Sequence, residues 1–282
     1  MTRHWQTRSR ILPLQRTLVM GILNLTPDSF SDGGRYVDAD QAIEHAYAMV
    51  EAGADIVDVG GESTRPGALP VPEGEELDRV IPVVGELAAA GLVVSVDTRK
   101  PKVAAAALEA GAEIVNDVSG LRHPEMRRVV AEAGAGAVIM HMQGEPATMQ
   151  QDPRYDDVVA EVEAFLLAQA GRSEAAGVAP EAIVLDPGIG FGKTVDHNLT
   201  LLRHLHRLAR HRYPVMVGTS RKSFLQRITG AAEAHRLDEA TAVTVALAIA
   251  QGVSVVRVHD VPLARDAAAV AEAIVGDSPW QA

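Results

Sequence analysis

Three segments of the chain repeat one pattern of apolar and polar positions. They read VEAGADIVDVGG from Val50, LEAGAEIVNDVSG from Leu108 and AEAGAGAVIMHM from Ala131. In each, an Ala/Glu-rich stretch ends at a glycine, which can take the left-handed conformation that closes a helix, and an apolar run follows at once. A continuous apolar run is typical of a strand that is buried on both faces of a parallel sheet. The pattern therefore predicts a helix followed by a buried strand in all three places.

Looser copies of this pattern, together with the apolar runs TLVMGILNLT and PVMVGTS, raise the number of predicted strands to eight. They span residues 17–25, 55–59, 93–97, 113–118, 137–141, 183–186, 215–218 and 255–258. Apolar residues near a 3.6-residue period predict helices between them, for example at 40–52 and 241–251. Eight strand–helix units in about 250 residues predict a (β/α)8 TIM barrel, with an open doubly wound sheet as the alternative. We expect one domain at 17–275, a short N-terminal extension at 1–16 and a C-terminal tail at 276–282.

The amino-acid composition excludes several classes of protein and leaves the predicted fold unchanged. The 282 residues are 47% hydrophobic, which suffices for a full core, and the formal net charge of −11 argues against a general nucleic-acid or membrane surface. There is no cysteine, which excludes disulfides and thiolate metal sites. The basic N-terminus has too short an apolar run for a secretory signal, and no stretch has the length of a membrane span. We therefore expect a soluble, cytoplasmic protein.

Polar residues stand at the C-terminal end of every predicted strand, where barrel enzymes build their active sites. A single polar group there is most simply a satisfied structural group, but eight strand ends that converge on one mouth favour a ligand site. These residues are Asn24, Asp58, Asp97, Asn116, His141, Asp186, Ser220 with Lys222, and Arg257 with His259. Because Arg257 and His259 are two apart on one strand, their side chains share a face.

Two loops combine glycine, hydroxyl groups and cations, which suits them to bind phosphate. They are GGESTRPG at 60–67 and GTSRKS at 218–223. Asp97 and Asp186 would repel an anion, so part of the ligand should present N–H donors to carboxylates. We expect a ligand with an anionic end and an N–H-rich end. A Schiff-base role for Lys222 is an alternative, weakened because Lys222 follows a loop beside Arg221, whereas such lysines usually lie within a strand.

The chain resembles the dihydropteroate synthase family, which joins a dihydropterin diphosphate to p-aminobenzoate in folate biosynthesis and is a target of sulfonamides. The resemblance runs from about residue 17 to about residue 273. It rests on the ordered motifs MGILNLTPDSFSDGG, DIVDVGGESTRPG, SVDTRKP, NDVSG, LDPGIGFGK, GTSRKSF and RVHDV. It implies a Mg2+-assisted substitution at the pterin methylene, with diphosphate as the leaving group, and a homodimer.

The resemblance also implies roles for matching residues. The pterin would contact Asp97, Asn116, Met140, Asp186, Phe191, Gly218 and Lys222. The diphosphate would contact Asn24, Thr64, Arg257 and His259, with Asn24 as the protein ligand of Mg2+; these four and Lys222 form the implied catalytic set. The p-aminobenzoate site and its loops would use Phe30, Asp32, Arg65, Pro66 and Ser223, together with Lys222.

No general base is assigned, because the aniline nitrogen of p-aminobenzoate is already neutral at pH 7. We expect His141 to be structural and Asp58 to orient neighbouring groups. One alternative is a pterin-binding methyltransferase that serves a corrinoid cofactor, which has no use for GGESTRPG, SRKS or RVHDV. Another is an inactive barrel, disfavoured because every matched position is filled. The segment TPDSFSDGG, which follows the first strand, is expected to form a lid over the diphosphate.

Overall fold

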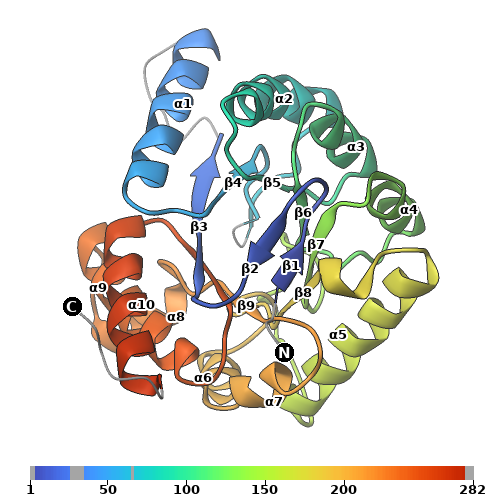
Figure 1. Cartoon of the computed structure of the whole chain (residues 1–282). Coiled ribbons are helices and arrows are strands. Elements are labelled where there is room, and N and C mark those ends of the chain that lie inside the picture. Colours follow the sequence, from blue (N-terminus) through green and yellow to red (C-terminus); the bar gives the residue numbers. More distant parts are fainter. Residues whose placement is uncertain (1–3, 26–34, 65–66, 277–282) are drawn as a thin grey trace.

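The computed structural model describes residues 4–25, 35–64 and 67–276, and side chains in the first helix from residue 39 (Figure 1). The expected TPDSFSDGG lid, with Phe30 and Asp32, lies outside these residues, as do Arg65 and Pro66.

Eight parallel strands form a barrel that is nearly closed. Their order is β8-β7-β6-β5-β4-β3-β10-β9. They span Leu18–Asn24 (β3), Ile56–Gly60 (β4), Val94–Asp97 (β5), Ile114–Asp117 (β6), Gly136–Met140 (β7), Ile183–Asp186 (β8), Met216–Val217 (β9) and Val255–Val258 (β10). The two end strands meet where Leu185 forms a bridge with Val215 and donates its N–H to Pro214 O at 2.9 Å. The predicted barrel is confirmed, and the open doubly wound sheet is wrong.

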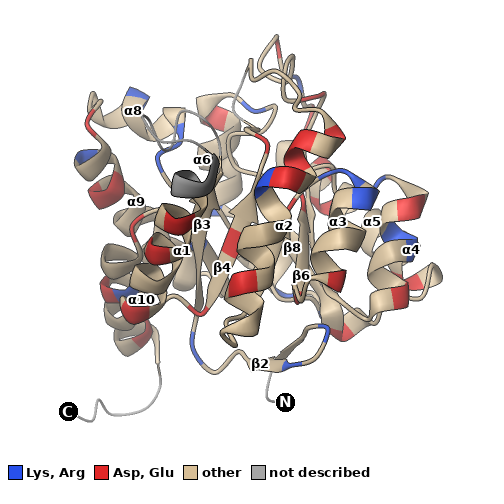
Figure 2. Cartoon of the chain, turned by 90° about the horizontal axis from the view of Figure 1, so that it is seen from above, with Lys and Arg blue, Asp and Glu red and all other residues tan. Residues whose placement is uncertain are grey.

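Helices surround the barrel (Figure 1). They span Arg35–Glu51 (α1), Glu73–Ala89 (α2), Pro101–Glu109 (α3), Pro124–Ala133 (α4), Val158–Ala175 (α5), Val195–Arg203 (α6), Leu205–Ala209 (α7), Ser223–Thr229 (α8), Ala234–Ile249 (α9) and Val261–Val275 (α10). Figure 2 shows acidic residues spread over this helical shell, for example on α1 and α2, in keeping with the net charge of −11. Within residues 4–25, 35–64 and 67–276, no helix is both long and apolar enough to cross a membrane.

The predicted helix starts at residues 40 and 241 come later than the observed ones. The helix α9 begins seven residues earlier, at Ala234, and its N-cap residue Glu233 makes no side-chain capping bond. Where a capping side chain is present, as at Asp157 before α5, it accepts hydrogen bonds from two backbone N–H groups, those of Val159 and Ala160. Because Glu233 makes no such bond, no capping residue marks the start of α9 in the sequence.

The N-terminal extension is a β-hairpin that covers the N-terminal end of the barrel. Its strands His4–Gln6 (β1) and Ile11–Pro13 (β2) pair antiparallel, and Figure 1 shows them lying across the centre of the ring. Trp5 is fully buried and donates from Nε1 to Ala182 O at 2.9 Å. It packs against inward-facing residues at the starts of the strands, including Leu18, Ile114 and Val184. The hairpin thus closes the N-terminal end of the barrel, and the C-terminal end carries the polar residues that follow the strands.

Candidate active site

The C-terminal ends of the strands lie side by side in register. Asn24 pairs with Gly60, Gly60 with Asp97, and Asp97 with Asn116. On the other side of the barrel Met140 pairs with Asp186. Parallel pairing thereby brings side chains that are far apart in the sequence to one edge of the sheet, as the strand-end pattern predicted.

Arg257 is the centre of a buried polar cluster at this edge. Its Nε donates to Asp58 Oδ2 at 2.6 Å, and its Nη2 donates to Asp97 Oδ2 at 2.7 Å. Asp58 Oδ2 also accepts from Asn116 Nδ2 at 2.9 Å, while Asp58 Oδ1, fully buried, has no hydrogen-bond partner in the described part of the chain. These contacts use two of the five guanidinium N–H groups, so the others can meet a ligand.

Two buried carboxyl groups at the mouth have pKa values shifted toward neutrality. Burial raises the pKa of Asp97 to about 7, because the charge of Arg257 only partly offsets the loss of water and Asp58 adds like charge. Burial likewise raises the pKa of Asp186 to about 6, although the Gly188 N–H, 2.7 Å from Oδ1, and nearby lysines favour the ionised form. A ligand that brings N–H donors would lower both pKa values and bind to the ionised forms.

An apolar wall stands beside these carboxyl groups. Met140 and Phe191 belong to one buried cluster with Val118, Met142 and Met149. Lys222 places its Nζ 3.8 Å from the centre of the Phe191 ring. Gly218 leaves room next to Arg257, since a Cβ built on it would lie 3.7 Å from Arg257 Cβ. The apolar wall thus stands at the same mouth as Lys222 and Arg257.

Ser220 holds His259 in place. Its Oγ accepts from the backbone N–H of His259 at 3.1 Å and lies 2.8 Å from the ring Nδ1. Sequence reasoning counted Ser220 among the polar strand ends but gave it no role. The signal that could have found it is the hydroxyl in GTSRKS, two residues before Lys222, in the loop after β9, whose neighbouring strand β10 directly precedes His259.

Asn24 is the one residue that the sequence proposed as a magnesium ligand. A Cβ built on Gly60 would lie 3.8 Å from Asn24 Oδ1 and 3.4 Å from Asp97 Cβ, so Asn24 stands beside the carboxylate cluster. Among the residues with described placement, no group of three or more His, Asp or Glu side chains could hold a metal ion. A single amide oxygen fits Mg2+ only where phosphate oxygens and water supply the other ligands.

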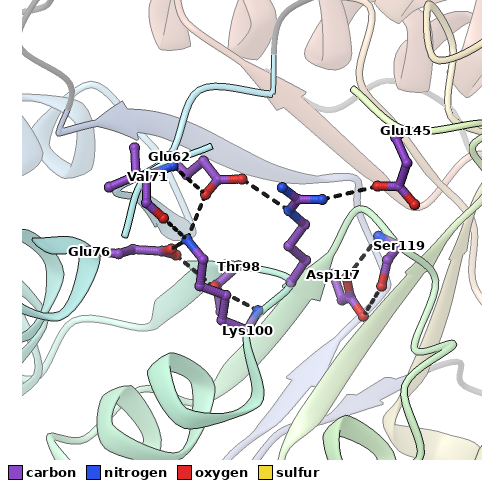
Figure 3. A network of polar contacts seen from close by, with 9 residues as sticks. Glu62, Val71, Glu76, Thr98, Lys100, Asp117, Ser119 and Glu145 are labelled. Atoms are coloured by element: carbon purple, nitrogen blue, oxygen red, sulfur yellow. Dashed lines mark hydrogen bonds and ion pairs between the residues drawn. The ribbon is translucent and has the colours of Figure 1, made fainter. Parts of the chain in front are cut away.

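A second polar network ties together the two described ends of the segment between β4 and α2, the first of which carries Thr64 (Figure 3). Glu62 accepts from Lys100 Nζ at 2.5 Å and from Arg99 Nε at 3.0 Å, and its Oε2 accepts from Val71 N at 3.1 Å. Lys100 also pairs with the buried Glu76, and Arg99 donates to Glu145 Oε2 at 3.0 Å. Both ends of the loop around the half-buried Thr64 are therefore tied to the residues that follow β5.

His141 does not act as an acid or a base in this arrangement. It is buried, and its Nδ1 lies 2.9 Å from Lys193 Nζ, which is a donor only. Burial, followed by the charge of Lys193, lowers the pKa of His141 to about 2. The ring therefore stays neutral, with its hydrogen on Nε2, which agrees with the structural role expected for it.

Comparison with known proteins places this chain in a family. Residues 20–259 match the family described as pterin binding enzyme. The chain is 48% identical over 263 residues to dihydropteroate synthase of Escherichia coli, covering 93% of each chain. Its structure superposes on that of Xanthomonas albilineans dihydropteroate synthase with 4-aminobenzoic acid, with a TM-score of 0.92 and 43% identity, over 99% of this chain and 100% of the other. Burkholderia cenocepacia dihydropteroate synthase complexed with 7,8-dihydropteroate gives a TM-score of 0.88 and 44% identity, over 97% and 96%. The chain therefore belongs to the dihydropteroate synthase family of pterin-binding enzymes.

Proposed function

We propose that this chain condenses (7,8-dihydropterin-6-yl)methyl diphosphate with p-aminobenzoate, giving 7,8-dihydropteroate and diphosphate. The observation that carries the proposal is the mouth of the barrel, where Asp97, Asn116 and Asp186 stand next to an apolar wall and to Arg257. Such a site has one half for a flat ring rich in N–H groups and another for an anion. Two of the relatives compared above hold 4-aminobenzoic acid and 7,8-dihydropteroate.

The pterin half of the site binds through hydrogen bonds and ring contacts. The amino and ring N–H groups of the pterin form an amidine-like edge that an ionised carboxylate accepts in a bidentate manner, which suits Asp186 and Asp97. Asn116 can both donate and accept. Met140, Phe191 and Gly218 lie against the ring, and Lys222 donates to its carbonyl.

The diphosphate half stabilises the leaving group. The aniline nitrogen of p-aminobenzoate bonds to the pterin methylene carbon while the bond from that carbon to the diphosphate oxygen breaks, and the nitrogen then loses a proton to solvent. Arg257, His259 and Thr64 donate to the departing oxygens, and Ser220 keeps His259 oriented. Mg2+, held by Asn24 and the phosphates, would neutralise part of the developing charge.

The proposed p-aminobenzoate site is made of loop residues and of the start of α8. Phe30, Asp32, Arg65 and Pro66 lie outside the described residues. Ser223 opens α8 directly after Lys222 and so stands at the same mouth. We propose that these five residues, with Lys222, bind the second substrate, and that the loops exclude water from the reacting carbon.

We also propose that the enzyme is a homodimer and works in the cytoplasm. The adjacent helices α9 and α10 each carry an exposed apolar pair at helical spacing, Val243 with Leu247 and Val270 with Ile274, all between 59% and 76% exposed. An exposed apolar face of this kind is covered when a second copy docks on it. Sedimentation of Leu247→Lys against the unmodified chain tests this, and a monomer in both would contradict it.

The activity is tested by mixing the protein with dihydropterin diphosphate, p-aminobenzoate and Mg2+ and following dihydropteroate and diphosphate together. We expect both products in equal amounts, and only when p-aminobenzoate is present. Binding of the pterin without this reaction would support the inactive barrel instead. Methyl transfer to a corrinoid would release no diphosphate and is disfavoured by the synthase relatives.

A further inference from the structure

Lys193 is a buried cation that the proposed reaction does not use. Its side chain stands at the end of the loop 187–193 that follows β8, and the residue is only 3% exposed. Its Nζ lies 2.9 Å from Gly188 O, 3.0 Å from Phe191 O, 2.9 Å from His141 Nδ1 and 3.3 Å from His141 O. Each of its three hydrogens therefore has an acceptor, which is what a buried ammonium requires.

The groups that Lys193 holds are those that shape the pterin pocket. Phe191 is the aromatic part of the apolar wall, and Gly188 donates its N–H to Asp186 Oδ1 at 2.7 Å. The loop lies so close to the end of β7 that a Cβ on Gly188 would fall 1.9 Å from His141 O. A change at Lys193 would therefore move both the wall and the donor that orients Asp186.

The charge of Lys193 also acts on Asp186. Burial raises the pKa of Asp186, and the cations that oppose this rise are Lys222 after β9, Lys193 after β8 and Arg257 on β10. The groups that face Lys193 itself are neutral His141, Asp186 and Lys222, and burial lowers its pKa to about 7. Lys193 is thus charged in the pH range where Asp186 titrates.

We propose that Lys193 is a positioning residue for the pterin pocket. It ties the loop 187–193 to the end of β7 so that Phe191 and the Gly188 N–H keep their places, and its charge favours the ionised form of Asp186. The proposal rests on the function proposed above in one respect, the binding of the pterin by Asp186.

The test is the affinity for 7,8-dihydropteroate, measured by calorimetry from about pH 5.5 to about pH 8.5 for the unmodified protein and for Lys193→Met. Binding needs both carboxylates ionised, so affinity falls in two steps as the pH drops, first through the pKa of Asp97, about 7, and then through that of Asp186, about 6. Lys193 acts on the second step, and the midpoint of that step is the one compared between variants. Without the cation the pKa of Asp186 rises, so the midpoint should move upward by about one pH unit. At about pH 5.5, below both values of the pKa of Asp186, affinity should fall by up to about tenfold, and at about pH 8.5, where Asp186 is ionised in both proteins, the charge difference should cost little.

Two further variants separate positioning and charge from general stability. Lys193→Arg keeps the cation, so it should leave the midpoint in place even if affinity drops. Arg265→Met is the matched control, because Arg265 also bonds to two backbone carbonyls, those of Thr17 and Gly53, and to Asp55, at the opposite end of the barrel. It should lower the melting temperature without moving the midpoint.

The proposal is overturned if Lys193→Met binds dihydropteroate with the unmodified affinity and midpoint, or if Arg265→Met shifts the midpoint equally. Should Lys193→Met not fold, Lys193→Gln against Lys193→Arg makes the same comparison of a neutral with a charged side chain, and equal midpoints would overturn it. Failure of the unmodified protein to bind dihydropteroate would instead count against the proposed function, so the two failures are distinguishable.

Discussion

Replacing Asp58 by Asn removes one buried charge from the cluster around Arg257 while keeping the side-chain volume. Asp58 is fully buried and accepts from Arg257 Nε at 2.6 Å and from Asn116 Nδ2 at 2.9 Å. Removing one partner of a buried ion pair destabilises a protein by about 3 to 5 kcal/mol when the other charge is left alone. Because Arg257 keeps Asp97, 2.7 Å away, we expect about 2 to 3 kcal/mol at pH 7.

The loss of stability in Asp58→Asn depends on pH, because Asp58 influences the pKa of Asp97. The like charge of Asp58 helps to raise the pKa of Asp97 to about 7, so the folded protein binds a proton there that the unfolded chain releases near pH 4. A raised carboxyl pKa means that stability falls as the pH rises from about 4 to about 7. In Asp58→Asn the pKa of Asp97 drops, because one neighbouring anion is gone and Arg257 remains. The stability of the variant therefore decreases less than that of the unmodified protein as the pH rises from about 4 to about 7.

Urea unfolding of the two proteins at about pH 5 and about pH 8 measures the difference directly. The variant should lose more stability relative to the unmodified protein at the lower pH than at the higher. The matched variant Asp55→Asn removes a carboxylate that pairs with Arg16 and Arg265 at the other end of the barrel. A loss independent of pH in Asp58→Asn, or the same pH dependence in Asp55→Asn, would refute the coupling between Asp58 and Asp97.

Other predictions concern the loops, the hairpin and the metal. Ser220→Ala should slow turnover by about tenfold and leave dihydropteroate affinity unchanged, because it removes the hydroxyl that contacts His259; equal loss of both would contradict this. Glu62→Gln should raise KM for the diphosphate substrate more than it changes pterin binding, since it loosens the loop that carries Thr64; an unaltered KM would count against it. Trp5→Ala should lower the unfolding free energy by about 3 to 5 kcal/mol, which thermal melting measures. The turnover of each folded molecule should stay normal, which activity assays with active-site titration measure. Chelation of Mg2+ should abolish turnover yet leave dihydropteroate binding intact, and loss of that binding would show that the metal serves the pterin half.

The barrel could be predicted because each of its strands is a short apolar run, and several follow directly on a helix-ending glycine. Every predicted strand is present, and its ends differ from the observed ones by one residue at most. The hairpin at the N-terminus could not be predicted in this way, since its strands have only three residues each. Its stability comes instead from Trp5, whose acceptor Ala182 lies 177 residues away.

From the sequence, residues can be assigned to one end of the barrel, but the contacts among them cannot. Strand ends placed Asp97 and Arg257 at one mouth, but the sequence assigned them to opposite halves of the ligand, whereas Arg257 bonds directly to Asp97, 160 residues away. Such pairs depend on how the barrel closes, which no local pattern records. Lys193 lies in a glycine-rich loop, and the composition of this loop is typical of an exposed turn. Only the folded structure shows that Lys193 is buried and that its ammonium group is fully hydrogen-bonded.

The proposed site has a pterin half and a diphosphate half, and the variants Asp186→Asn and His259→Ala each alter one of them. Dihydropteroate contains the pterin and p-aminobenzoate parts and lacks the diphosphate, so its affinity does not depend on contacts to the diphosphate. Asp186→Asn should weaken dihydropteroate binding, because the amide cannot accept both N–H groups as a carboxylate does. His259→Ala should bind dihydropteroate as the unmodified protein does, while its turnover falls. Equal loss of dihydropteroate affinity in both variants would contradict the account.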